Sequence, residues 1–274
     1  MQRAQINGAT IEYDVQGSGE PVLLIHGAHI ADAYAPLLAE SGLDSRYRLI
    51  PYHRRGFAGS SRAPVPFSIA AQAADAAALL RQLGIREAHV VGHSSGGDIA
   101  LQLALDAPDL VHSLVVLEPA LLMVPSGEQF AAAIGPAVAS YQAGDRVAAV
   151  DGFLRAALEN PDYRRTLDPV LPAGWFAQVV ADADTFYQAE LPSVGEWPFN
   201  AELARRIRQP VLAVLGAESG PMFREGHELV RQWLPQAEPF VLPGTTHTLQ
   251  MQNPRGLAEA LAGFFARHPL PVAA

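Results

Sequence analysis

The 274-residue sequence contains no cysteine. This absence excludes disulfide bonds, cysteine nucleophiles and thiolate metal ligands. The sequence also lacks a run of about 18 apolar residues that would suggest a membrane span. Its first residues, Met1 to Gly8, lack the apolar stretch of a signal peptide. We therefore expect a cytoplasmic protein that does not enter a membrane.

Runs of basic residues are missing as well. The net charge is −9, and no cluster of Lys or Arg offers a surface for a phosphate backbone, so we expect no nucleic-acid partner. The histidines show no metal-ligand spacing such as H-E-x-x-H, so we expect no metal site.

Apolar residues, by contrast, make up 49% of the chain, enough to bury a sizeable core. Short apolar runs, typical of strands buried on both faces, alternate with segments that have helical patterns. This alternation predicts an α/β fold, a parallel sheet with helices on both faces. The predicted strands are 11–15, 22–25, 48–52, 88–91, 114–117, 211–215 and 239–242, and the predicted helices are 69–83, 98–105, 223–234 and 257–267.

The alternation stops between residues 120 and 200. This stretch is rich in alanine and interrupted by prolines, and it contains no buried strand pattern. Helices are predicted there over 130–141, 147–159 and 172–183. The sequence therefore predicts a core of residues 1–119 and 201–274, interrupted by a helical cap of residues 120–200.

A serine lies at the most informative point of the pattern. The segment Gly92-His93-Ser94-Ser95-Gly96 joins a predicted strand directly to a predicted helix. So sharp a turn strains the backbone of Ser94, and glycines two positions before and after it remove side chains that would collide. The turn exposes the Ser94 hydroxyl and leaves the Ser95 N–H free at a helix start. We therefore predict that Ser94 is a nucleophile.

A serine hydroxyl needs a base near neutral pH, and the base needs an acid to orient it. His247 is the candidate base, because it follows the last predicted strand and so lies at the same edge of the sheet as Ser94. The turn at His26-Gly27-Ala28 follows the first buried strand. We expect the N–H groups of Ala28 and Ser95 to form an oxyanion hole.

These motifs resemble those of the α/β-hydrolase superfamily. The matching residues are His26-Gly27, Arg55 to Ser60, Gly92 to Gly96, and Gly244 to His247. The resemblance implies an α/β-hydrolase fold, an eight-stranded and mostly parallel sheet with a cap inserted after the sixth strand. Many relatives place the acid as G-x-x-D after the seventh strand. Here that stretch is Gly216-Ala217-Glu218-Ser219, so the expected aspartate is a serine.

Two carboxylates can replace that aspartate. Glu118 ends the sixth strand, where the resemblance to certain lactone hydrolases and haloalkane dehalogenases also places an acid. A carboxylate at the end of a buried strand is costly unless it is paired, and a histidine would pair it. Glu218 lies one position from the usual site and is the alternative acid. We favour Glu118.

The nucleophile limits the chemistry. Relatives that cleave epoxides or carbon–halogen bonds need aspartate at position 94, whereas Ser94 favours esters, lactones, thioesters, amides, or carbon–carbon bonds beside a ketone. We predict a cofactor-independent carboxylesterase or lactonase, monomeric or homodimeric, that acts on a medium-sized apolar small molecule. A carbon–carbon bond hydrolase and a non-catalytic binding protein are the alternatives. The candidate substrate-binding residues are His29, Met123, Trp175, Phe186 and Tyr187.

Overall fold

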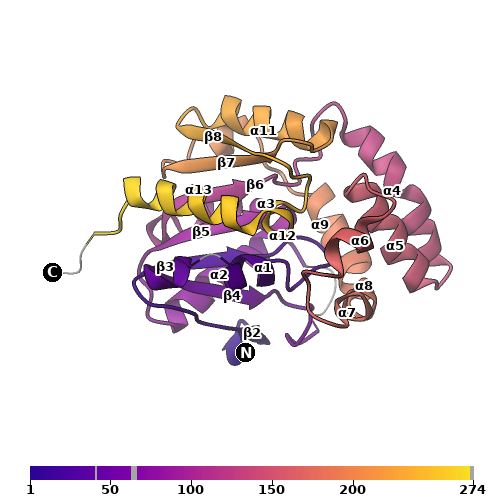
Figure 1. Cartoon of the computed structure of the whole chain (residues 1–274), viewed down its shortest axis with the longest axis horizontal. Coiled ribbons are helices and arrows are strands. Elements are labelled where there is room, and N and C mark those ends of the chain that lie inside the picture. The colour runs from indigo at the N-terminus through magenta and orange to yellow at the C-terminus, as the bar shows by residue number, and fades with distance from the viewer. Residues whose placement is uncertain (41, 63–66, 272–274) are drawn as a thin grey trace.

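The computed structural model describes residues 1–40, 42–62 and 67–271. It confirms the α/β fold class, with an eight-stranded sheet in the order β1-β2-β4-β3-β5-β6-β7-β8 (Figure 1). The β1–β2 and β2–β4 pairs are antiparallel, and all other pairs are parallel. The strands are β1 Gln2–Ile6, β2 Ala9–Tyr13, β3 Glu20–Ile25, β4 Tyr47–His53, β5 Ala88–His93, β6 Val111–Leu117, β7 Val211–Gly216 and β8 Ala237–Leu242.

Side chains alternate across the sheet, and each face has its own apolar cluster. In β3, Leu23 and Ile25 pack into the cluster that includes α2, α3 and α11. Val22 and Leu24 pack into the opposite cluster with α1 and α13. Helices therefore cover both faces of the sheet, as the buried strand patterns predict. These helices are α1 Ala35–Glu40, α2 Ile69–Gln82, α3 Ser95–Asp106, α11 Pro221–Trp233 and α13 Pro254–Arg267, and the short α12 Leu249–Gln252 precedes α13.

The described residues between β6 and β7 form helices and no strand. We call this segment the insertion; its helices gather at one end of the sheet (Figure 1). Its apolar cluster includes Phe153, Trp175 and Phe186, and it also contains Ile30 from a loop of the core and Met251 from α12. Its helices are α4 Gly127–Gln142, α5 Arg146–Ala157, α6 Tyr163–Leu167, α7 Trp175–Ala181, α8 Ala183–Thr185, the π-helix Phe186–Glu190, α9 Leu191–Gly195 and α10 Ala201–Ala204. The domain boundaries near 120 and 200 stay predictions.

Two local differences from the sequence-based expectation stand out. Strand β1 is not among the predicted strands, although Asn7 and Gly8 both have positive φ and form the tight turn of a β1–β2 hairpin. The helix expected over 172–183 is the shorter α7, because Gly174 takes a left-handed conformation just before Trp175. No helix in the described part of the chain is long and apolar enough to cross a bilayer.

Candidate active site

Ser94 occupies the sharp turn between β5 and α3. Its backbone angles are φ 53° and ψ −126°, which an L-residue rarely adopts. The flanking positions have no room for a side chain. A Cβ on Gly92 would lie 2.2 Å from the carbonyl oxygen of Gly96, and a Cβ on Gly96 would lie 2.3 Å from the carbonyl oxygen of Ile25. The strained turn presents the serine hydroxyl at the carboxyl edge of the sheet.

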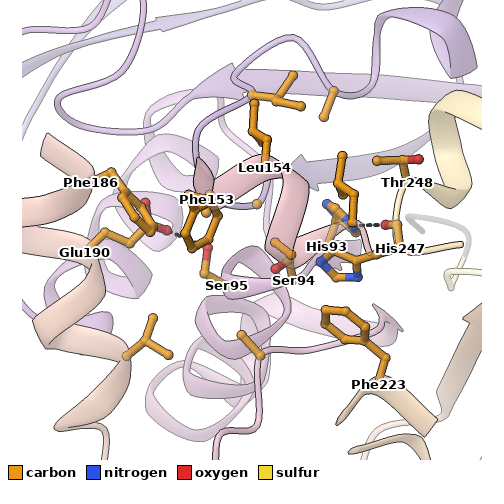
Figure 2. A pocket seen from close by; sticks show the side chains of 18 of the residues that line it. His93, Ser94, Ser95, Phe153, Leu154, Phe186, Glu190, Phe223, His247 and Thr248 are labelled. Carbon is orange, nitrogen blue, oxygen red and sulfur yellow. Dashed lines mark hydrogen bonds between the residues drawn. The ribbon is translucent and has the colours of Figure 1, made fainter. Parts of the chain in front are cut away.

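Ser94 and His247 line one cavity of about 70 Å³ (Figure 2). Ser94 Oγ makes no hydrogen bond with the imidazole in this conformation, as far as the described residues go. Catalytic hydrogen bonds often tighten only when substrate binds. The wall of the cavity is mainly apolar and comes from the core and the insertion alike; it includes Ala28, Phe130, Phe153, Leu154, Phe186 and Phe223.

The carboxylate of Glu118 contacts the Nδ1 edge of the His247 imidazole. His247 Nδ1 lies 2.7 Å from Glu118 Oε2, and Glu118 is 1% exposed. The second carboxylate oxygen, Oε1, accepts hydrogen bonds from the Gly216 N–H at 2.7 Å and from Ser219 Oγ at 2.5 Å. Ser219, at the position where relatives have the acid, thus donates a hydrogen bond to Glu118. Because Nδ1 faces the carboxylate, Nε2 of His247 is left for proton transfer.

Two rings fix the plane of the imidazole. Phe223 stacks on His247 with ring centroids 3.6 Å apart, and His93 lies on it at 4.7 Å (Figure 2). The Nε2 of His93 is 2.8 Å from the backbone oxygen of His247. Burial lowers the pKa of His93 well below its ordinary value, so its ring is neutral and donates this hydrogen bond through Nε2. His93 therefore restrains the loop without adding a charge beside His247.

Ala28 and Ser95, whose backbone N–H groups are the predicted oxyanion donors, both line the same cavity. Ala28 follows the turn after β3, and Ser95 is the first residue of α3. Within the described part of the chain, neither N–H donates a hydrogen bond to another protein atom. Unpaired N–H groups at a helix start attract negative charge. We therefore keep these two N–H groups as the candidate oxyanion hole.

Of the five candidate substrate-binding residues, only Phe186 lines the cavity. His29 lies behind the wall, with its ring 3.9 Å from that of Phe186; burial lowers its pKa to about 3, so it is neutral. Trp175 and Tyr187 pack into the apolar core of the insertion. Met123 is 46% exposed on the outside of the molecule. We therefore retain Phe186 alone as a candidate substrate contact.

The remaining carboxylates near the cavity differ in their surroundings. Glu218, the alternative acid, makes no hydrogen bond with His247, and it lines a second hollow that shares His247 and Phe223 with the cavity. Glu190, from the π-helix of the insertion, is fully buried and lines the cavity itself. No sequence motif singles out Glu190, since its place depends on how the insertion folds over the sheet.

The molecule contains a second hydrogen-bonded set of the same residue types. His89 Nδ1 lies 2.7 Å from Ser113 Oγ, and its Nε2 lies 2.9 Å from Glu20. Ser113 and His89 are fully buried, and burial lowers the pKa of His89 to about 4. This set borders none of the cavities described above. In the described residues, no group of three or more His, Asp or Glu side chains is arranged to hold a metal ion.

Comparison with known proteins identifies the family of this chain. A fluoroacetate dehalogenase of Burkholderia sp. is 38% identical over 46% of this chain, and that match spans only 44% of the dehalogenase. A 2-hydroxymuconate semialdehyde hydrolase of Pseudomonas putida is 27% identical over 92% of this chain and 89% of its own length. The solved enol-lactonase from Burkholderia xenovorans LB400 has the same fold, with a TM-score of 0.81, 20% identity and coverage of 97% and 100%. The family model described as "alpha/beta hydrolase fold" matches residues 20–254, and this chain therefore belongs to the alpha/beta hydrolase fold family.

Proposed function

We propose that this protein is a serine hydrolase that cleaves carboxylic esters or lactones of largely apolar small molecules. The observation that carries the proposal is the contact of 2.7 Å between Glu118 and His247, beside Ser94 in one cavity. A carboxylate-paired imidazole in the same cavity as a serine hydroxyl is what activation of a serine requires. The family assignment alone does not specify the reaction.

The proposed reaction runs through an acyl-enzyme. His247 Nε2 takes the proton as Ser94 Oγ attacks the carbonyl carbon, and the N–H groups of Ala28 and Ser95 hold the resulting oxyanion. His247 then gives the proton to the leaving oxygen, and the bond from carbonyl carbon to that oxygen breaks. A water molecule, deprotonated by His247, attacks the acyl-enzyme and releases the acid and free Ser94. Glu118 orients the imidazole and stabilises its charged form throughout.

The lining of the cavity favours a substrate whose acyl group is apolar and neutral. Its wall is built mainly from aromatic and aliphatic side chains, which favour apolar ligands. Esters with apolar acyl groups and lactones both place an apolar chain against this wall. Butyrate esters and small lactones are therefore suitable probes.

A carbon–carbon bond hydrolase is the second candidate. The relative that matches 92% of this chain is named for a semialdehyde, a substrate name that contains no ester. The same serine, histidine and carboxylate would serve that reaction. The two candidates are separated by comparing kcat/KM for 4-nitrophenyl butyrate, a butyrolactone and a vinylogous diketone.

The proposal is tested by labelling with a fluorophosphonate, which reacts with activated serines. We expect the wild type to be labelled and to hydrolyse 4-nitrophenyl butyrate, and Ser94→Ala to lose labelling and at least about 10⁴-fold in kcat. Ser113→Ala is the matched control, because Ser113 also pairs with a histidine but is fully buried. A wild type that is neither labelled nor active, or a Ser94→Ala variant that keeps both properties, would show that the proposal is wrong.

A further inference from the structure

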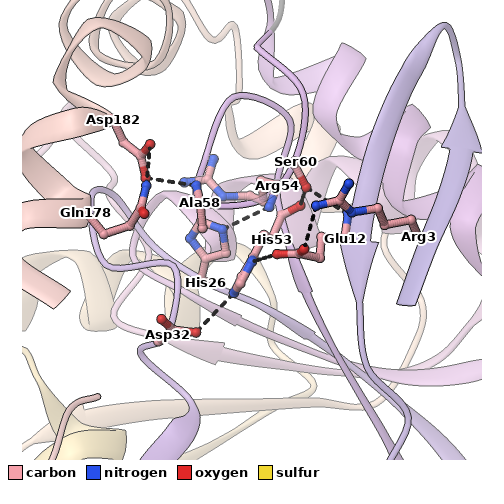
Figure 3. Close-up of polar contacts among 10 residues, drawn as sticks. All are labelled: Arg3, Glu12, His26, Asp32, His53, Arg54, Ala58, Ser60, Gln178 and Asp182. Atoms are coloured by element: carbon pink, nitrogen blue, oxygen red, sulfur yellow. Dashed lines mark hydrogen bonds and ion pairs between the residues drawn. The ribbon is translucent and has the colours of Figure 1, made fainter. Parts of the chain in front are cut away.

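The peptide that carries the Ala28 N–H is held through its other end. Its carbonyl oxygen, Gly27 O, lies 2.8 Å from His26 Nδ1 and accepts a hydrogen bond from Arg54 Nη2 at 2.9 Å. His26 Nε2 accepts from the Arg54 backbone N–H at 3.0 Å (Figure 3), so Nδ1 carries the proton and donates. Burial lowers the pKa of His26 well below its ordinary value, which keeps this ring neutral. Two donors on one carbonyl fix the peptide plane and polarise its N–H.

The second N–H belongs to Ser95, whose side chain is also held. Ser95 Oγ donates a hydrogen bond of 2.5 Å to Glu190 Oε1 (Figure 2). Glu190 ends the π-helix of the insertion, so this bond connects the insertion to the first residue of α3. Single π-turns are frequent at functional sites.

One buried ion pair connects these two contacts. Arg54 Nη2, the same atom that binds Gly27 O, lies 2.7 Å from Glu190 Oε1, the same atom that accepts from Ser95. Neither side chain is more than 1% exposed. Burial raises the pKa of the neighbouring Asp98 well above its ordinary value, which disfavours a second negative charge near the guanidinium. Buried pairs of this kind are costly to assemble, and they are better at fixing geometry than at adding stability.

We propose that Arg54 and Glu190 are positioning residues for the oxyanion hole. The pair fixes the Gly27–Ala28 peptide from one side and Ser95 from the other, so both donors are set when the π-helix of the insertion docks on the core. The guanidinium also lies one peptide unit from the oxyanion, where a positive charge favours the transition state. This inference rests on the proposed function.

The test uses full-length Ser95→Ala and Glu190→Gln, with 4-nitrophenyl butyrate as substrate. Ser95→Ala keeps the backbone N–H and removes only the contact with Glu190. We expect each variant to lose about tenfold in kcat with little change in KM, less than the roughly 10²–10³-fold loss that follows removal of a whole donor. Because the two substitutions break one network, the double variant should lose less than the product of the single losses.

The matched control is Asp75→Asn. Asp75 is buried and forms an ion pair at 2.7 Å with the partly buried Arg55, the residue after Arg54, but it touches neither oxyanion peptide. We expect this variant to lower Tm and leave kcat within about twofold. If Glu190→Gln does not fold, the smaller change in Ser95→Ala still carries the test.

An inhibitor distinguishes positioning from general loosening. An aryl trifluoromethyl ketone forms an oxyanion with the serine, whereas butyrate, the product, does not. We expect Ki for the ketone to rise in proportion to the loss of kcat/KM in Ser95→Ala and Glu190→Gln, with Ki for butyrate unchanged. The pH dependence of kcat should not shift, since the Glu118–His247 contact is untouched.

The outcomes separate the two proposals. A wild type that is neither labelled by fluorophosphonate nor active overturns the proposed function and this inference together. An active wild type, combined with Ser95→Ala and Glu190→Gln losses no larger than that of Asp75→Asn, overturns this inference alone. So does an unchanged Ki for the trifluoromethyl ketone.

Discussion

Glu118 and Ser219 come from neighbouring strands, and together they make the contact that holds His247. The carboxylate stands at the end of β6, and the residue after β7 that carries the acid in many relatives is here a hydrogen-bond donor to it. Because β6 and β7 are parallel neighbours, their carboxyl ends lie side by side, and Ser219 contacts the carboxylate that pairs with His247. The candidate acid therefore comes from the strand next to the one that carries it in many relatives.

The first prediction distinguishes the two candidate acids. In Glu118→Gln the imidazole loses its negative partner and its fixed tautomer, so kcat for 4-nitrophenyl butyrate should fall by about 10³–10⁴-fold. Glu218→Gln should stay within about twofold of wild type. The measurement is kcat of both variants beside Tm, which checks that each is folded. A loss confined to Glu218→Gln would reverse the assignment.

The sequence allows part of this site to be predicted, for physical reasons. Ser94 has a local signature, because the strand, the turn and the helix are consecutive. Glu118 and His247 are 129 residues apart in the sequence, yet both follow strands of one parallel sheet. The sequence therefore predicts that both lie at the carboxyl edge of that sheet. Glu190 reaches Arg54 across 136 residues, and that contact depends on how the insertion docks, which no local pattern encodes.

At the scale of elements, His53 connects three segments at the end of β4. Its Nδ1 lies 3.0 Å from Glu12 in β2, and its Nε2 lies 3.0 Å from Asp32, which follows the turn after β3 (Figure 3). Burial opposes the charged form, but hydrogen bonds and charges from Asp32 and Glu12 outweigh it and raise the pKa of His53 above 6.5. A charged His53 therefore stabilises the junction of these segments.

The second prediction follows from the sign of that shift. A raised pKa in the folded state contributes stability that is full below the unfolded value of about 6.5 and is lost as pH rises through the folded pKa. The Tm difference between wild type and His53→Gln should be larger near about pH 6 than near about pH 9. Thermal unfolding at both pH values measures it. An equal or reversed difference would contradict the proposed pairing.

Elements differ in how well the sequence predicts them. Continuous apolar runs such as 22–25 and 211–215 lie within β3 and β7, because strands buried on both faces leave an unmistakable pattern. The pattern of β1 is weak, since three of its five residues are exposed at the edge of the sheet. The π-helix Phe186–Glu190 has no pattern of its own, because apolar spacing does not separate it from an α-helix.

In the whole molecule, the insertion is fastened to the core by polar contacts as well as apolar ones. Asp182 accepts a hydrogen bond of 2.8 Å from the Ala58 N–H (Figure 3), and Thr185 Oγ1 donates one of 2.8 Å to Gly56 O. A Cβ on Gly56 would lie 2.5 Å from Thr185 Cγ2, so the chains approach closely there. These contacts and the Arg54–Glu190 pair all come from residues 182–190 of the insertion.

The third prediction is that core and insertion unfold together. Removing either partner would leave buried polar groups unpaired in the other, which favours a single cooperative transition. Of the three tryptophans, Trp175 packs in the insertion, whereas Trp197 and Trp233 pack on the core. The fluorescence of Trp175→Phe therefore reports on the core, and that of the double variant Trp197→Phe/Trp233→Phe reports on the insertion. Both thermal curves, each compared with the Tm of the same variant by circular dichroism, should coincide with the loss of secondary structure. A fluorescence transition of the double variant that precedes this loss would contradict the prediction.

The bond from Ser95 to Glu190 has a consequence for how this enzyme would discriminate by size. A substrate too bulky for the cavity would displace the π-helix and with it Glu190. Arg54 would then lose its ion-pair partner, and the N–H groups of Ala28 and Ser95 would no longer be aligned. Such a molecule could occupy the cavity and still react slowly. Large esters would then be rejected during turnover instead of at entry, and chain-length selectivity would appear in kcat far more than in KM.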